Sequence, residues 1–358
     1  MPGGIHPPLE VILSWPARSD HPIRRGWGIT IATIVLWAIT ILVVAGRLWA
    51  RLKIQKIGGL DDLIIVIALI PLTGVAICVA GSGRAYFDRH VWELTAEEGA
   101  TSRKLVVAVD LLYMTSTTLT KISILLFYRR LASGTISNFF RWAVRLCIGF
   151  VASYYIAFTL ALFLGCRPLD AFWNQLELDW RLTHKEGRDW TCFNESADLL
   201  TATSVSVLQD FITCLMPCIL FWRLQLPFRQ KVALAAVFAF GFFTSLTAVV
   251  RLYYIQMIFY QTYDVTWYTG LAFLWTTIEV HLGIICASAP ALKIFFQRYF
   301  DTSRLTGAIS TWSSKSRSRK GTMQPDWDIK NQSFLLSDVK APFSRSVSTI
   351  HDIEARVL

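Results

Sequence analysis

The sequence predicts an all-α membrane protein, in which seven transmembrane helices form one bundle. Of its 358 residues, 54% are hydrophobic and only 17% are charged, and the mean hydropathy is +0.45. A soluble domain carries about 25% charged residues, and it has too little interior to hide this much apolar surface. Composition therefore excludes a disordered chain, a collagen-like fibre and a small disulfide scaffold.

Seven segments are long and apolar enough to span the bilayer, which takes about 20 residues of helix. The predicted spans are 26–48, 62–83, 105–128, 145–166, 198–222, 231–259 and 266–295. The first, second and fourth contain uncharged runs of sufficient length, as does the sixth before Arg251. The others are accepted with internal charges: Asp110 and Lys121 in the third, Asp210 in the fifth and Glu279 in the seventh.

Lys and Arg in the loops predict the orientation, because cytoplasmic loops are enriched in both. The loops after spans one, three and five are basic, and the last two of these contain no acid. By contrast, segment 84–104 is balanced and segment 165–197 has six acidic and four basic residues. We therefore expect residues 1–25 outside or in the lumen, a membrane domain over 26–300 and a cytosolic tail over 301–358. The localisation expected is the plasma membrane or another membrane of the secretory pathway.

The longest outer loop carries two predicted modifications. Cys166 and Cys192 share this loop in an oxidising compartment, so we expect them to form a disulfide, with two free thiols as the alternative. Asn194 begins an Asn-Glu-Ser glycosylation sequon on the same side. It lies only four residues before Asp198, close to the expected membrane surface.

The tail is polar and rich in serine, with a basic stretch at 315–320. Such a composition cannot bury a core, so we expect disorder. The tail is a candidate for contact with the anionic inner leaflet or with signalling proteins. A solvated tail without a specific role is the alternative.

Charges deep in the membrane need a partner or water, because each costs at least about 2.5–3.5 kcal/mol to insert. Helix rise places Asp210, Arg251 and Glu279 at compatible depths in the outer half of the bilayer. They are expected to form a polar cluster, which either lines a ligand pocket or ion path or simply joins spans five, six and seven. Lys121 is expected on the inner side, closer to Asp61 and Asp62.

No cofactor, metal or nucleic acid is expected. Retinal would need a lysine in the middle of the last span, where only Lys293 occurs, near its end. A metal site would need grouped ligands, and His281 is the only histidine within a predicted span. The excess of basic residues follows membrane topology rather than a nucleic-acid-binding pattern. The expected partners are the lipid bilayer and a lipophilic small molecule.

Several motifs occur together in a recognisable order. They are Gly58-Gly59-Leu60-Asp61-Asp62, the segment 121–130 that ends in Tyr-Arg-Arg, Cys166-Arg-Pro with Phe172-Trp173 and Cys192, and then Asp198, Pro217, Arg251 and Glu279. Over about 27–300 the chain resembles the fungal rhodopsin-domain membrane proteins, the family of the satratoxin-cluster membrane protein and of receptor-like proteins of plant-pathogenic fungi. This resemblance implies seven helices without retinal and an association with secondary-metabolite gene clusters.

The resemblance favours a receptor-like or accessory membrane protein, linked to fungal secondary metabolism. A membrane enzyme is the first alternative, a cyclase or hydrolase acting on a lipophilic intermediate. Asp210 and Glu279 would then be the catalytic acids, because burial of a carboxyl group favours its protonated form. A transporter that uses Asp210, Arg251 and Glu279 as a relay is the second alternative.

The predicted topology can be tested with reporters. A reporter fused after Leu358 should lie in the cytosol, whereas one inserted near Leu182 should lie in the lumen, as protease protection or glycosylation tags would detect. Finding both on the same side of the membrane would contradict the seven-span topology.

Overall fold

The computed structural model describes residues 5, 7–21, 23–56, 58–131, 138–175, 180, 183–184, 187–222 and 228–299. Of these, residues 131, 217–222, 228–237 and 292–299 are described by their backbone alone. The predicted tail at 301–358 lies outside the described residues, and its expected disorder stays a prediction.

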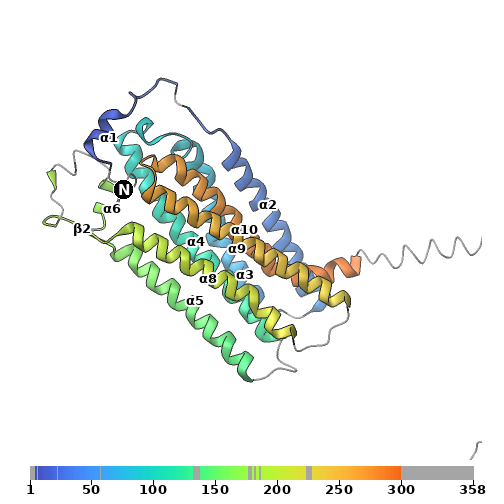
Figure 1. Ribbon diagram of the computed structural model, residues 1–358. Coiled ribbons are helices and arrows are strands. Elements are labelled where there is room, and N and C mark those ends of the chain that lie inside the picture. The colour runs from blue at the N-terminus through green and yellow to red at the C-terminus, as the bar shows by residue number, and fades with distance from the viewer. Residues whose placement is uncertain are drawn as a thin grey trace, which may run out of the picture. The chain divides into compact units, whose positions relative to one another are not determined.

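In the described part of the chain, seven long helices pack side by side (Figure 1). They are α2 (Gly28–Trp49), α3 (Leu60–Ala85), α4 (Ala96–Leu131), α5 (Asn138–Leu164), α8 (Glu195–Trp222), α9 (Phe228–Tyr260) and α10 (Val265–Tyr299). Each contains a stretch long and apolar enough to cross a membrane. The predicted all-α bundle of seven transmembrane helices is therefore confirmed, while the side on which each terminus lies stays a prediction.

Short elements connect or precede these helices. They are α1 (Leu9–Ser14), the π-helix η1 (Ala50–Gln55), the 3-10 helix η2 (Val91–Glu93), β1 (Cys166–Arg167), α6 (Ala171–Asn174) and β2 (Thr191–Cys192). The π-helix continues α2 directly, and it ends at Lys56 in the left-handed conformation with φ of 53°.

Helix α10 is the central element of the bundle, because it packs against α2, α3, α4 and α9. Helix α5 contacts α4 and α8 at one edge of the bundle, whereas α2 lies at the opposite edge (Figure 1). The largest apolar core joins Ile65, Leu72 and Val79 of α3 to Val280 and Ile284 of α10. Polar groups on the inward face of α10 are therefore shielded from lipid by its neighbours.

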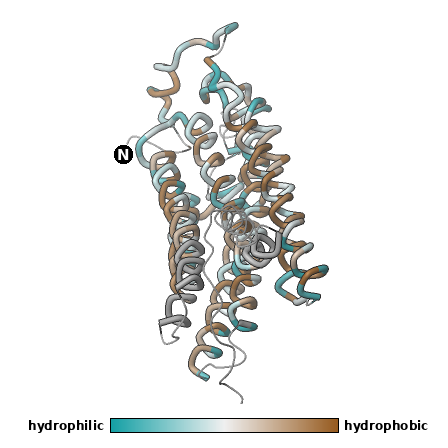
Figure 2. The backbone as a smooth tube through the Cα atoms, turned by 90° about the vertical axis from the view of Figure 1, so that its right-hand side faces the viewer, coloured by the Kyte–Doolittle hydropathy of each residue, from teal (hydrophilic) through white to brown (hydrophobic). Residues whose placement is uncertain are grey.

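The outward surface is apolar, as a bilayer requires. Large hydrophobic side chains are exposed along the peripheral helices, among them Ile31 and Leu42 of α2 and Leu146 and Phe163 of α5. Figure 2 shows that hydrophobic residues dominate the long helices, while hydrophilic residues gather toward their ends and in the connections.

Most hydroxyl groups inside the helices are satisfied on their own helix. Thr33 and Thr40 donate to the carbonyl groups of Ile29 and Leu36, each at 2.8 Å, and Thr115 does the same to Leu111. This bonding to residue i−4 is the usual local solution for Ser and Thr in helices. Charged side chains have no such local solution, so they must find partners on other helices.

The two ends of the bundle differ. At one end, β1 pairs antiparallel with β2, so that Cys166 faces Cys192. These two cysteines form a disulfide, as predicted. We call this the disulfide end, and we call the opposite end, which holds Asp61 and Asp62, the arginine end.

At the arginine end, three arginines hold the two acids that begin α3. Arg47 contacts Asp62 at 3.0 Å and Asp61 at 3.1 Å, and it also donates to the carbonyl of Ala287 on α10. Arg51 lies 3.5 Å from Asp61, and Arg130 of α4 lies 3.2 Å from it. The N-terminus of α3 further favours both carboxylates, and Asp62 accepts the Gly59 N–H at 3.2 Å. This cluster ties four helices together.

The cluster also explains why residue 59 is a glycine. A Cβ atom there would clash with the Asp61 carboxylate and with the Arg130 guanidinium. At the neighbouring Gly58, a Cβ atom would meet only the tip of Leu52, at 3.3 Å.

Gly59→Ala should therefore lower the free energy of unfolding by about 1–3 kcal/mol, the usual cost of overpacking. Gly58→Ala is the matched control and should lose less, because a leucine tip can rotate away. Thermal unfolding of the two purified variants measures the difference. Equal stability of Gly59→Ala and wild type would contradict the described packing of Asp61 and Arg130.

Candidate functional site

An ion pair lies deep in the bundle between α9 and α10. The Nε atom of Arg251 is 2.8 Å from the Oε2 atom of Glu279, and the two residues are 5% and 2% exposed. Arg251 also donates to the hydroxyl of Thr203 at 3.3 Å and to that of Tyr113 at 2.7 Å. The Tyr113 hydroxyl in turn donates to Glu279. Every nitrogen of the guanidinium group thus has an acceptor, which is the condition for burying a charge that cannot be neutralised.

A second ion pair joins α4 to α8. The Nζ atom of Lys121 is 2.9 Å from the Oδ1 atom of Asp210. It is also 3.2 Å from both the carbonyl oxygen and the hydroxyl of Ser206, and 3.4 Å from Gln209. Lys121 is 6% exposed, so this pair is also shielded.

The two ion pairs belong to one hydrogen-bonded network. The Ser206 hydroxyl lies 3.4 Å from the Tyr113 hydroxyl and 3.2 Å from Lys121, so it bridges them. The network contains residues of α4, α8, α9 and α10. Such a polar network fixes the relative positions of its helices, because each unmade bond inside the membrane is costly.

The structure arranges the sequence-predicted residues differently from expectation. Lys121 does not pair with Asp61 or Asp62, because arginines hold those acids at the arginine end. Lys121 pairs with Asp210 instead. Of the two acids expected near Arg251, Glu279 is the one that forms an ion pair with it. The expected single cluster of Asp210, Arg251 and Glu279 is thus two ion pairs that Ser206 and Tyr113 connect.

Tyr113 and Thr203 were not predicted from the sequence, whereas Ser206 lies on the same polar face of the fifth span as Asp210. Tyr113 is spaced four residues from Thr117 and eight from Lys121 on α4, which puts all three on one helix face. That spacing was a usable signal. Nothing in the sequence indicates that the Tyr113 hydroxyl links the two ion pairs rather than facing the membrane interface.

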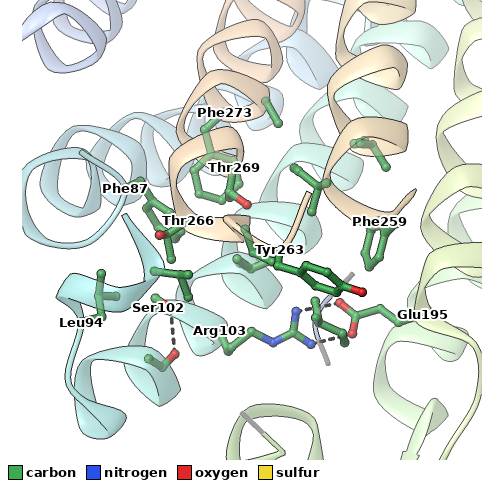
Figure 3. Close-up of a pocket in the computed structure, with 18 of the residues that line it drawn as sticks. Phe87, Leu94, Ser102, Arg103, Glu195, Phe259, Tyr263, Thr266, Thr269 and Phe273 are labelled. Carbon is green, nitrogen blue, oxygen red and sulfur yellow. Dashed lines mark hydrogen bonds and ion pairs between the residues drawn. The ribbon is translucent and has the colours of Figure 1, made fainter. Parts of the chain in front are cut away.

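A cavity of about 310 Å³ opens between α4, α8, α9 and α10 toward the disulfide end. Its walls are largely apolar and include Phe87, Phe259, Phe273, Ile255 and Val106. The N-terminal segment contributes side chains as well, namely Ile5, Pro7, Ile12 and Trp15. Figure 3 shows Phe273, Thr269 and Thr266 along α10, Phe259 on the neighbouring helix, and the Tyr263 ring extending toward Glu195.

Most of the charged side chains that line the cavity have an ion-pair partner. Arg103 and Glu195 form a two-pronged ion pair at the edge, with distances of 2.8 and 2.6 Å (Figure 3). Arg251, which also lines the cavity, is neutralised by Glu279. Among the described residues, the Asp110 side chain has no hydrogen-bond or ion-pair partner. The cavity therefore combines apolar walls with a single unpaired carboxyl group.

A smaller cavity of about 60 Å³ lies beyond the network, lined by Lys121, Asp210, Glu279, Gly283 and Cys286 among others. Arg251 faces the larger cavity and Glu279 the smaller one. The Arg251–Glu279 pair therefore forms a polar partition between the two spaces.

Asn194 caps α8. Its side-chain oxygen accepts from the hydroxyl of Ser196 at 2.6 Å and from the N–H of Ala197 at 3.2 Å, which is the usual role of an N-cap asparagine. The residue is exposed at the disulfide end, and its glycosylation stays a prediction.

The described residues do not fit a retinal linkage or a metal site. Between 265 and 292, α10 contains no lysine, and Lys121 of α4 is bound to Asp210. No group of three or more His, Cys, Asp or Glu in the described ranges lies close enough to hold a metal ion.

Comparison with known proteins decides the family. The profile of the fungal rhodopsin domain matches residues 46–298, most of the chain. The chain belongs to the fungal rhodopsin-domain family. The matched range includes all residues of both buried ion pairs.

Relatives of the chain carry three kinds of name. One is a SAT4 family membrane protein of Emericella nidulans, 30% identical over 60% of this chain and 50% of its own length. Another is receptor GIN3 of Arthrobotrys oligospora, 29% identical over 85% of this chain and 72% of its own length. The wortmanamides biosynthesis cluster protein C of Talaromyces wortmannii is 26% identical over 82% of this chain and 77% of its own length. The chain spans about half the length of the first of these relatives. No solved structure matches the chain.

The buried ion pairs predict a specific pattern of rescue. Arg251→Met should lower the free energy of unfolding by about 3–5 kcal/mol, because it leaves Glu279 buried without a partner. Adding Glu279→Gln should recover part of this loss. Adding Asp210→Asn instead should recover nothing and should destabilise further, since it leaves Lys121 buried without its acidic partner.

Folded yield and thermal unfolding of the single and double variants measure this pattern. The reciprocal control is Asp210→Asn, which Lys121→Met should rescue and Glu279→Gln should not. Wild-type stability of Arg251→Met, or rescue by Asp210→Asn, would show that the pairs are not those described.

Proposed function

We propose that this family member is a receptor-like membrane protein that binds a lipophilic small molecule in the cavity at the disulfide end. The observation that carries the proposal is the unpaired Asp110 carboxyl group in a largely apolar cavity of about 310 Å³. This combination of apolar walls and few oriented polar groups is typical of small-molecule sites.

The charges of the cavity favour a ligand with one cationic or hydrogen-bond-donating group. Arg103 and Glu195 neutralise each other, as do Arg251 and Glu279. Among the described residues that line the cavity, this leaves the Asp110 carboxyl group to be matched. A ligand that is apolar except for one such group would pack against the apolar walls and form a hydrogen bond or ion pair with the Asp110 carboxyl group. The relatives' names, a receptor and several biosynthesis cluster proteins, favour a secondary metabolite as this ligand.

The network below the cavity supports a receptor role. Arg251 touches both the cavity and Glu279, and the network continues through Tyr113 and Ser206 to Lys121 and Asp210. A ligand that moves Arg251 therefore acts on four helices at once. The enzyme alternative lacks support, because Asp210 and Glu279, its expected acids, are each bound to a cation.

Ligand selection tests the binding site. Purified wild-type protein should retain compounds from a lipophilic fungal metabolite fraction, as affinity-selection mass spectrometry detects. Asp110→Asn should bind them at least about tenfold more weakly, since a hydrogen bond to a charged group is lost. Asp170→Asn, at the start of α6, is the matched control and should bind like wild type. If Asp110→Asn bound these compounds as tightly as wild type, this cavity would not be their binding site.

Gene deletion with metabolite profiling separates the functions. A receptor predicts unchanged metabolite structures with an altered response to them. Accumulation of a precursor would indicate chemistry or transport instead.

A further inference from the structure

A third cavity lies at the arginine end of the bundle. Its volume is about 590 Å³, and it lies where α3 begins, α4 ends and α5 begins. Four arginines line it, Arg129 and Arg130 of α4 and Arg141 and Arg145 of α5. We call it the arginine cleft. Gly58, Gly59, Leu60, Asp61 and Leu126 complete its walls.

The charge of the arginine cleft is strongly positive. Among the described residues that line it, Asp61 is the one acid, and Arg47, Arg51 and Arg130 already contact that carboxylate. Arg129, Arg141 and Arg145 form no ion pair with a described residue. The sequence from 129 to 145 contains no acid that could neutralise them.

The arrangement exceeds what membrane topology requires. Positive residues near span ends set orientation wherever they point, yet here four arginines from two helices line one space. Arg141 and Arg145 are four residues apart, which puts them on the same face of α5. Guanidinium groups that converge in this way match the oxygen atoms of a phosphate group.

The surroundings of the cleft indicate a lipid rather than a soluble anion. Phe139, Trp142 and Leu146 are exposed on the same end of the peripheral helix α5. An exposed tryptophan beside apolar side chains is typical of the headgroup level of a membrane. Trp142 also contacts Arg145, whose guanidinium carbon lies 5.2 Å from the ring centre. A phospholipid whose phosphate group lies in the cleft would thus place its acyl chains along the apolar face of α5.

We propose that the arginine cleft is a binding site for the phosphate-bearing headgroup of an anionic phospholipid. Arg129, Arg141 and Arg145 bind the phosphate oxygens, and the first turns of α5 contact the acyl chains. If the predicted orientation holds, the cleft faces the cytosolic leaflet, where anionic lipids are concentrated. The site is separate from the cavity that contains Asp110.

Native mass spectrometry of the purified full-length protein tests the site with three probes. These are short-chain phosphatidylinositol bisphosphate, short-chain phosphatidylcholine and soluble inositol trisphosphate. The first should bind to wild type, the neutral lipid should not compete with it, and the soluble headgroup should compete only weakly because it lacks acyl chains. Equal competition by inositol trisphosphate would assign the cleft to a soluble phosphate compound and overturn the lipid proposal.

Matched variants separate a built site from general surface charge. The double variant Arg141→Gln with Arg145→Gln should weaken binding of the anionic lipid by at least about tenfold. Lys53→Gln with Lys56→Gln removes the same charge at the same end outside the cleft, and it should change binding by less than about twofold, as screened surface charges do.

An equal loss in both double variants would overturn the proposal. Since Arg141 and Arg145 are exposed, their replacement should leave thermal unfolding without lipid unchanged. Arg129→Gln, at the α4 side of the cleft, provides an independent variant, and its failure to weaken lipid binding would also contradict the assigned site.

Discussion

The ion pair between Arg251 and Glu279 is the constraint on which the rest of the membrane domain depends. An arginine cannot shed its charge in the membrane, so α9 can insert as it does only if α10 supplies an acid at the same depth. Glu279 meets that requirement at 2.8 Å, and Tyr113 extends the contact to α4. The central position of α10 thus follows from the charge it must neutralise as well as from its apolar packing.

The same logic repeats along the bundle at different depths. Lys121 and Asp210 join α4 to α8, and the arginines around Asp61 and Asp62 join α2 and η1 to α3 and α4. Between these polar layers, most serine and threonine hydroxyl groups donate to carbonyl groups of their own helices. In lipid, apolar packing alone does little to determine which helices become neighbours, because apolar side chains contact lipid and protein equally well. The paired charges therefore specify which helices become neighbours.

The sequence was sufficient for the fold because the constraint behind it is simple. Each run of about 20 apolar residues must become a helix when the membrane offers no hydrogen bonds, and Cys166 and Cys192 shared one loop. Depth along each helix was also predictable, which put Arg251 and Glu279 together. The partner of Lys121 was not predictable, since depth says nothing of the direction in which a long side chain extends. The cavity and the bridging roles of Tyr113 and Ser206 depend on helix rotation and packing, which a single sequence does not display.

The central claim is that the Arg251–Glu279 pair separates the larger cavity at the disulfide end from the smaller one beyond it. Cysteine accessibility tests it most directly, with a charged, membrane-impermeant thiol reagent added to the face that bears the disulfide end. The account predicts that Thr269→Cys, in the larger cavity, reacts, whereas the native Cys214 and Cys286 of the smaller cavity stay unlabelled. It also predicts that Glu279→Gln, which weakens the partition, increases labelling of Cys286. Labelling of Cys286 in the wild type at the rate of Thr269→Cys, or no labelling of Thr269→Cys, would contradict the account.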